Sequence, residues 1–161
     1  MKRSAHDVFG LAVGLWVSKA FPIADNLLIN FFSIIAATMF MNRFIDGFLG
    51  HKRFRRTPYT HSFSSLLIAS FAIVLLFYCF AQLLGFNMLI HPLQNLFMIL
   101  LSTGLAHLLA DSLTADGIYL FWPFTNRRIS LTKKRYDDGL LNSLTIFISL
   151  MLTILYLYVE L

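Results

Sequence analysis

Long apolar segments dominate this chain of 161 residues and leave few folds open to it. Five segments can be drawn, with short polar connections between them: Val8 to Phe21, Leu27 to Ile45, Phe63 to Leu84, Pro92 to Leu113 and Leu140 to Val159. The last four approach the roughly 20 residues that a helix needs to cross a bilayer. The pattern therefore predicts an all-α, polytopic membrane protein of about five helices, folded as a single domain over residues 1–161.

The composition supports the same class. Hydrophobic residues make up 58% of the chain and charged residues 13%, whereas soluble domains average about 45–50% and about 25%. The single cysteine, Cys79, cannot form a disulfide within the chain. No small-xxx-small pattern dominates a segment, so the oligomeric state is left open.

The first segment, Val8 to Phe21, is short for a membrane span, and Lys19 lies near its end. We expect either that the Lys19 amine reaches the interface along its apolar stem or that the helix lies partly in the interface. A secretory signal peptide is the alternative, because two basic residues precede the apolar run and small residues follow it. His6 and Asp7 interrupt the start of the run and argue against a signal peptide.

Basic residues gather in alternate connections, and their distribution predicts the orientation. They are Lys2 and Arg3 before the first segment, Arg43, Lys52, Arg53, Arg55 and Arg56 around the second connection, and Arg127, Arg128, Lys133, Lys134 and Arg135 in the fourth. With five helices, these regions share one side of the membrane, and only Lys19 falls toward the other. Because cytoplasmic connections carry an excess of Lys and Arg, we expect that side and the N-terminus to be cytoplasmic.

The net charge of +5 does not require a nucleic-acid partner. The basic runs lack the interleaved aromatic residues on which bases stack. Setting the topology and contacting anionic lipid head groups are sufficient roles for them. We therefore expect membrane lipids as partners, and we do not expect nucleic acid.

Histidines and carboxylates collect on the same predicted side of the membrane. His107 and Asp111 are four residues apart near the end of the fourth segment, so a helix places them on one face. Ionisable groups in an apolar span are costly and usually have a function or a partner. The predicted metal ligands are His6, Asp46, His51, His61, His107 and Asp111. His91 lies on the opposite side and is an internal negative control.

Imidazole and carboxylate ligands together suit zinc, manganese, iron and nickel. We expect the site to bind one or two divalent ions, and zinc is the most favoured. If two ions bind, phosphate chemistry is indicated, because two-metal centres typically serve it. The predicted reaction is metal-assisted hydrolysis of a lipid or phosphoester bond at the cytoplasmic face, on a small-molecule or lipid substrate. Asp137 or Asp138 would handle protons, and Asn142 would orient the substrate.

Several of these residues also have structural interpretations. The pair of His107 and Asp111 could form a hydrogen bond between helices. Asp137 and Asp138 could be ordinary loop acids beside basic neighbours. Gly117 is expected to shape the turn after the fourth segment rather than to contact a substrate.

Five motifs occur in order along nearly the whole chain. They are His6; Asn42 to Asp46, running into Gly50 and His51; Arg56 to Ser62, which contains His61; His107 to Gly117, with Pro123; and Tyr136 to Asp138, with Asn142. As a set they resemble the YdjM-like family of inner-membrane-associated, metal-dependent hydrolases, especially its short archaeal branch. The resemblance implies a helical membrane fold and a metal site more strongly than it implies a particular reaction.

The chain departs from the pattern of the bacterial members at two positions. Those members typically carry Pro-Asp-Ile-Asp after the second segment and His-Arg-x-x-Thr-His-Ser before the third. Phe44 stands here where the first Asp would be, and Arg56 stands roughly where the first His would be. Either His51 compensates or the site has fewer ligands. A looser likeness to zinc-dependent phospholipases C, which are helical and use His and Asp ligands, is an analogy that fits a phosphoester at the membrane surface.

Two other functions compete with hydrolysis. Intramembrane His and Asp residues also form relays for protons or metal ions, so a transport protein is one alternative. The lack of ionisable residues in the far half of the third and fifth segments weighs against it. The other alternative is a non-catalytic membrane protein with a structural metal ion.

Overall fold

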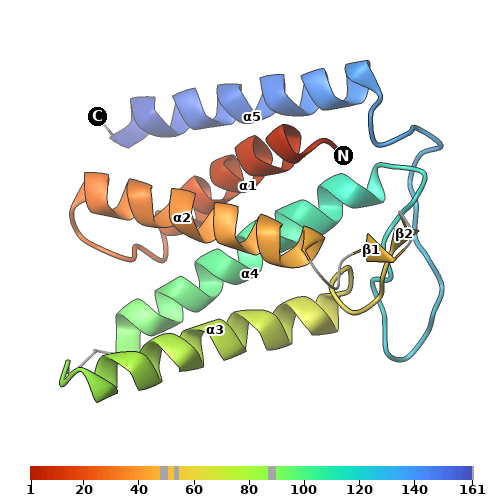
Figure 1. Cartoon of the computed structure of the whole chain (residues 1–161). Helices are drawn as coiled ribbons and strands as arrows, with labels where there is room; N and C mark the ends of the chain where they lie inside the picture. Colours follow the sequence, from red (N-terminus) through yellow and green to blue (C-terminus); the bar gives the residue numbers. More distant parts are fainter. Residues whose placement is uncertain (48–50, 53–54, 87–89, 161) are drawn as a thin grey trace.

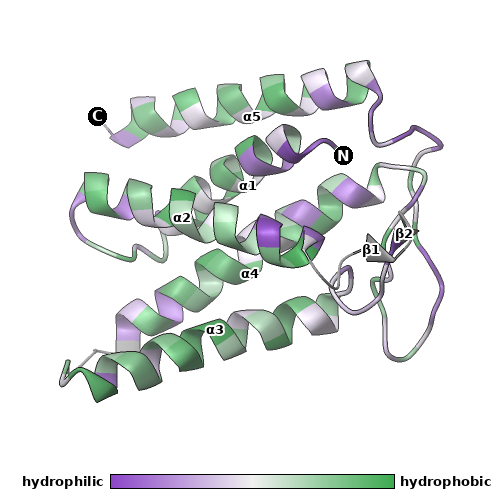
Figure 2. Cartoon of the chain, viewed as in Figure 1, coloured by the Kyte–Doolittle hydropathy of each residue, from purple (hydrophilic) through white to green (hydrophobic). Residues whose placement is uncertain are grey.

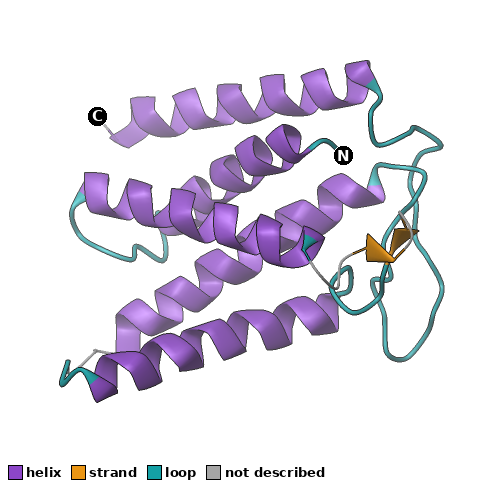
Figure 3. Cartoon of the chain, in the orientation of Figure 1, coloured by secondary structure: helices purple, strands orange, loops and turns teal. Residues whose placement is uncertain are grey.

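The computed structural model describes residues 1–47, 51–52, 55–86 and 90–160. The helices in this part of the chain are α1 (Arg3–Ser18), α2 (Leu27–Asp46), α3 (Phe63–Leu83), α4 (Ile90–Ser112) and α5 (Gly139–Glu160). Between α2 and α3, the two-residue strands β1 (His51–Lys52) and β2 (Arg55–Arg56) pair antiparallel (Figures 1 and 3). The all-α class is confirmed, and α2 to α5 begin and end within two residues of their predicted bounds.

Local signals account for several helix ends. The Asn26 side chain accepts a hydrogen bond from the Ile29 backbone nitrogen at 3.1 Å and caps α2. Ser62 caps α3 in the same way through the Ser65 nitrogen, at 3.3 Å. Gly85 follows α3 with a φ of 76°, a left-handed conformation that favours glycine and ends the helix.

The four helices α2 to α5 are each long and apolar enough to cross a membrane. Hydrophobic residues predominate along them, and hydrophilic residues occur mainly near the helix ends and in the connections (Figure 2). Many of their large apolar side chains are exposed on the outside of the bundle, where lipid would surround them. The chain is a polytopic helical membrane protein.

Helix α1 lies in the middle of the bundle and packs against α2, α4 and α5 (Figure 1). Two of its glycines, Gly10 and Gly14, permit this close approach. A Cβ atom added at Gly14 would lie 2.7 Å from Ile34 Cγ2, and one added at Gly10 would lie 2.8 Å from Thr38 Cγ2. The two glycines therefore form a small-xxx-small seam within the chain, which the sequence analysis did not identify.

The predicted bounds of the first helix, Val8 to Phe21, were wrong. Helix α1 begins earlier, at Arg3, because His6 and Asp7 find polar partners inside the bundle and do not interrupt the helix. It also ends earlier, at Ser18. The amine of Lys19, just after α1, forms an ion pair with Glu160 at the end of α5, with Nζ and Oε1 2.7 Å apart.

The N-terminus, the α2–α3 connection and the α4–α5 connection lie at one end of the bundle, as the spacing of the apolar segments predicts (Figure 1). We call this the basic end, because it carries most of the Lys and Arg residues. His91, near the start of α4, lies at the other end, as expected of the control residue.

Candidate metal centre

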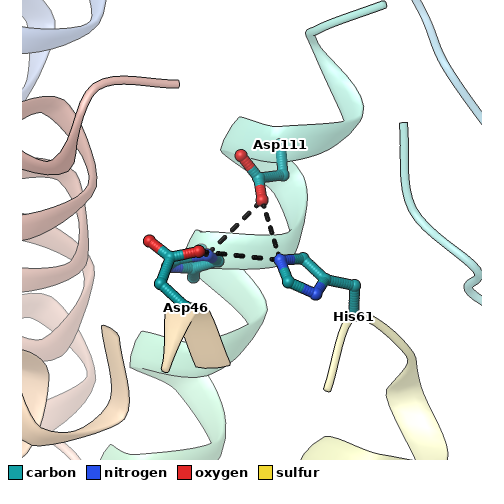
Figure 4. Close-up of side chains that lie close together, drawn as sticks. Asp46, His61 and Asp111 are labelled. Carbon is teal, nitrogen blue, oxygen red and sulfur yellow. Dashed lines mark ion pairs between the residues drawn. The ribbon is translucent and has the colours of Figure 1, made fainter. Parts of the chain in front are cut away.

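Four side chains from three regions of the chain meet at the basic end of the bundle. Asp46 is the last residue of α2, His61 lies just before α3, and His107 and Asp111 are one turn apart on α4. One ligand atom from each lies within 4.8 Å of the other three. Figure 4 shows the side chains of Asp46, His61 and Asp111 pointing toward one another. The predicted meeting of these distant residues is confirmed, and the group could bind a metal ion.

The distances within the group suit a tetrahedral ion. His107 Nε2 lies 3.4 Å from both Asp46 Oδ1 and Asp111 Oδ2. His61 Nε2 lies 3.7 Å and 3.5 Å from the same two oxygens. Around a tetrahedral zinc ion with bonds of about 2.0–2.1 Å, neighbouring ligand atoms are about 3.3–3.4 Å apart. The four His–Asp distances are therefore close to the spacing that such an ion requires.

The group is almost completely buried. The His61 and His107 side chains are 0% exposed and that of Asp111 is 1% exposed, whereas the Asp46 side chain is 19% exposed. His107 Nε2 and Asp111 Oδ2 make no hydrogen bond to any described residue. Buried polar atoms without partners are rare because they cost free energy. A cation between the carboxylates and imidazoles would satisfy both atoms.

Hydrogen bonds orient both imidazoles toward the centre. Asn42 Nδ2 donates to Asp7 Oδ1 at 2.7 Å, so the amide oxygen of Asn42 faces His107 and accepts from its Nδ1 at 2.9 Å. In the neutral form of the ring, His107 Nε2 would then present a lone pair to the group, the arrangement that second-shell partners impose on metal-binding histidines. His61 Nδ1 is 3.0 Å from Thr60 Oγ1, which leaves its Nε2 for the centre. Burial lowers the pKa of His61, so this ring is neutral near pH 7.

The two oxygens of Asp111 have separate environments. Oδ1 accepts hydrogen bonds from the Met1 amino nitrogen at 2.8 Å, from His6 Nε2 at 3.0 Å and from Arg56 Nη2. The Arg56 guanidinium also donates to Thr114 Oγ1 at 2.8 Å and to the Gly117 carbonyl at 3.1 Å. Two cationic donors and one imidazole therefore surround Oδ1, and Oδ2 faces the four-residue group.

Gly117 shapes the turn after α4, as expected. Its φ is 62°, and an added Cβ atom would lie 2.5 Å from the Ile129 carbonyl oxygen. Only glycine fits this combination of left-handed backbone and close approach. The turn in this way presents the carbonyl that Arg56 contacts.

His6 lies beside the four-residue group and not within it. Its ring stacks on that of His107, with the ring centroids 3.9 Å apart and the planes 12° from parallel. Its Nε2 is already engaged with Asp111 Oδ1. The geometry thus gives His6 a supporting position, and its role as a ligand stays a prediction. The side chain of His51, another predicted ligand, lies outside the described part of the chain.

The three residues predicted to be catalytic have structural partners. Asp138 Oδ1 accepts from the Leu141 nitrogen at 2.8 Å and caps α5, and this hydrogen bond lowers the pKa of Asp138. Asp137 Oδ1 pairs with Arg135 Nε at 3.3 Å. The Asn142 amide accepts from the Lys2 nitrogen at 2.9 Å and donates to the Tyr136 carbonyl at 2.9 Å. Their catalytic roles stay predictions.

Sequence analysis gave no role to Asp7 or to the Asn42 side chain, although both orient the centre. The sequence does contain a signal for Asn42. It is four residues from the predicted ligand Asp46, so the two side chains share a face of α2. No comparable signal pointed to Asp7, because its contact with Asn42 joins residues 35 positions apart.

Comparison with known proteins gives one family. Neither the curated proteins nor the solved structures contain a significant match to the chain. The family described as YdjM inner membrane protein matches residues 1–161, which is the whole chain and includes all the motifs described above. The chain therefore belongs to the YdjM inner membrane protein family.

Proposed function

We propose that the protein binds one divalent metal ion, zinc in preference to manganese, iron or nickel, through Asp46, His61, His107 and Asp111. The observation that carries the proposal is the convergence of their four ligand atoms, which lie within 4.8 Å of one another, with each histidine nitrogen 3.4–3.7 Å from both carboxylate oxygens. A single ion is favoured over two because Asp111 Oδ1 and His6 Nε2 already bond to each other. Neither atom is left to bridge to a second ion.

We further propose that the centre hydrolyses a phosphoester, in a lipid or a small molecule, at the cytoplasmic membrane face. When bound, a divalent ion there supplies Lewis acidity and activates water near neutral pH. Asp46 is the most exposed of the four side chains, so water and substrate would approach from its side. In the reaction, the water oxygen forms a bond to phosphorus, the bond to the leaving alcohol breaks, and the proton passes to that alcohol. The location of the group at the basic end of the bundle supports this orientation.

A chromogenic phosphodiester, bis(p-nitrophenyl) phosphate, and a fluorescent glycerophospholipid in mixed micelles test the activity. Purified protein loaded with zinc should hydrolyse at least one of them. His61→Ala should reduce the rate by at least 100-fold, and His91→Ala should retain it. Equal rates for wild type and His61→Ala would contradict the hydrolase proposal.

A structural metal ion is the second candidate. Catalytic zinc sites usually have three protein ligands and an open position, whereas structural sites are closed by four. The four-residue set and the burial of His61, His107 and Asp111 would also suit the closed type, whereas the partial exposure of Asp46 suits the open one. Cobalt substitution separates the two functions. If the visible spectrum of the cobalt protein shifts when phosphate is added, the ion is accessible and catalysis is supported. If the spectrum is tetrahedral and does not respond to phosphate, and the Tm depends on the metal, a structural role is supported.

A further inference from the structure

An apolar groove of about 560 Å³ opens on the side of α4 at the basic end of the bundle. It is lined by Phe9 and Val13 of α1, by residues of α4, and by the α4–α5 connection, including Ile129 and Leu131. Ser102 and Ser112 are the hydroxyl-bearing residues of its lining. Both hydroxyls donate to backbone carbonyls of α4, at 3.0 Å and 2.7 Å, so they offer no spare hydrogen to a ligand. The groove therefore suits a hydrocarbon chain.

This groove is separate from the metal centre. At about 100° per residue, Leu105 and Leu109 of the groove lie about 160° and 200° around α4 from His107. The body of the helix thus stands between the groove and the four-residue group. A ligand in the groove would not touch the proposed metal ligands, so its binding can succeed or fail independently of the proposed hydrolysis.

Positive charge stands next to the groove. Arg127 and Arg128 immediately precede Ile129, which lines it, and both arginines are exposed. Neither forms an ion pair with a described residue, whereas Lys134 and Arg135 of the same connection pair with Asp138 and Asp137. The apolar groove is complementary to a phospholipid tail, and the unpaired guanidinium groups beside it are complementary to an anionic head group.

The same connection also presents apolar side chains to its surroundings. Phe121 is 58% exposed, Phe124 93% and Leu131 62%. Exposed apolar side chains grouped in this way mark surfaces that contact a membrane or another protein. The connection therefore lies against the membrane surface, where phospholipid is the abundant amphiphile.

We propose that this groove holds one acyl chain of an anionic phospholipid, whose phosphate is bound by Arg127 and Arg128. The chain would lie against Val13, Leu105 and Leu109. Occupancy would brace α4 from the side opposite the metal centre.

Native mass spectrometry of the full chain in detergent, titrated with dioleoylphosphatidylglycerol, tests the proposal. Near an anionic lipid each basic residue is worth about 1 kcal/mol, so the double variant Arg127→Gln and Arg128→Gln should bind about 30-fold more weakly. The matched control is Lys134→Gln with Arg135→Gln, which removes the same charge from the same connection and should stay within about twofold of wild type. An equal loss of lipid affinity in both double variants would show that the lipid is attracted by diffuse positive charge, and it would contradict a specific site at Arg127 and Arg128.

The groove has its own matched pair of variants. Leu109→Trp fills it and should weaken lipid binding at least tenfold, whereas Leu76→Trp adds the same ring to an exposed position on α3 and should not. Unchanged binding in Leu109→Trp would show that no chain enters the groove. Tight binding of dioleoylphosphatidylcholine would also overturn the proposal, because it would show that an anionic head group is not needed. Full displacement of the lipid by soluble glycerol 3-phosphate would overturn it as well, because it would show that the acyl chain is not needed.

Discussion

At the scale of single residues, Asp111 joins the centre to the rest of the bundle. One carboxylate oxygen accepts from His6 on α1 and from Arg56 in β2, and the other faces the four-residue group. A carboxylate buried in this way would be strongly destabilising without compensating charge. The Met1 amine and the Arg56 guanidinium supply that charge at Oδ1, and a carboxylate is the form in which Asp111 would bind a divalent ion.

Asn42 provides a direct test of how His107 is oriented. Asn42→Ala removes the acceptor from His107 Nδ1, so the ring can rotate or change tautomer. Loss of such a second-shell partner typically lowers metal affinity by about 10–100-fold. Competition with a zinc chelator measures the change. The control is Asn95→Ala, which removes an amide hydrogen bond to Pro22 in the first connection and should leave zinc affinity unaltered.

The centre was predictable from the sequence only in part. His107 and Asp111 share a helical face, so their proximity follows from their spacing. The approach of Asp46 and His61 followed from the predicted topology, which brings the α2–α3 connection to the end of α4. The supporting position of His6 could not be foreseen, because it depends on how deeply α1 enters the bundle and on the Gly10 and Gly14 contacts that allow it.

At the scale of helices, the seam of α1 predicts an uneven response to added methyl groups. Gly14→Ala places a Cβ atom 2.7 Å from Ile34 Cγ2 and 3.0 Å from Thr103 Cγ2. Overpacking of this kind costs about 1–3 kcal/mol. Gly139→Ala is the control, because its Cβ would meet nothing within 4 Å. Thermal unfolding in detergent should show a lower Tm for the first variant alone, and a normal Tm for Gly14→Ala would mean that α1 packs elsewhere.

The N-terminus of α5 predicts a pH-dependent effect. Hydrogen bonding to the Leu141 nitrogen and the Lys134 ion pair lower the pKa of Asp138, so its capping contribution is present at neutral pH. That contribution is lost as the pH falls through the lowered pKa, because protonation removes the charged acceptor. Asp138→Ala should therefore lower the Tm at pH 7 more than at pH 3. Asp138→Asn, which keeps a capping oxygen, should have a smaller effect at pH 7.

The helix bounds show where reading the sequence succeeded and where it failed. Helices α2 to α5 are long apolar runs, and the length of these runs locates them in the sequence; Asn26 and Ser62 mark the starts of α2 and α3. The start of helix α1 cannot be located in this way, because His6 and Asp7 interrupt the apolar run although the helix continues through them. Inside this bundle both residues have buried or half-buried partners, so the helix continues through them.

At the scale of the whole molecule, the arrangement of helices predicts which connections share a side of the membrane. In a Cys79→Ser background, a cysteine introduced by Arg128→Cys should be shielded in right-side-out vesicles, and one introduced by Asp25→Cys should react with an impermeant maleimide. The positive-inside bias favours this orientation. The opposite labelling pattern would place the four-residue group on the outer side and remove the cytoplasmic part of the proposed function.

The spacing of four ligand atoms at one end of the bundle is the central claim, and the metal content of purified protein tests it most directly. Wild type and His91→Ala should each carry about one zinc ion per chain, as a four-ligand tetrahedral site would hold. His61→Ala and His107→Ala, confirmed as folded by circular dichroism, should carry almost none. Equal metal content in all four proteins would contradict the account.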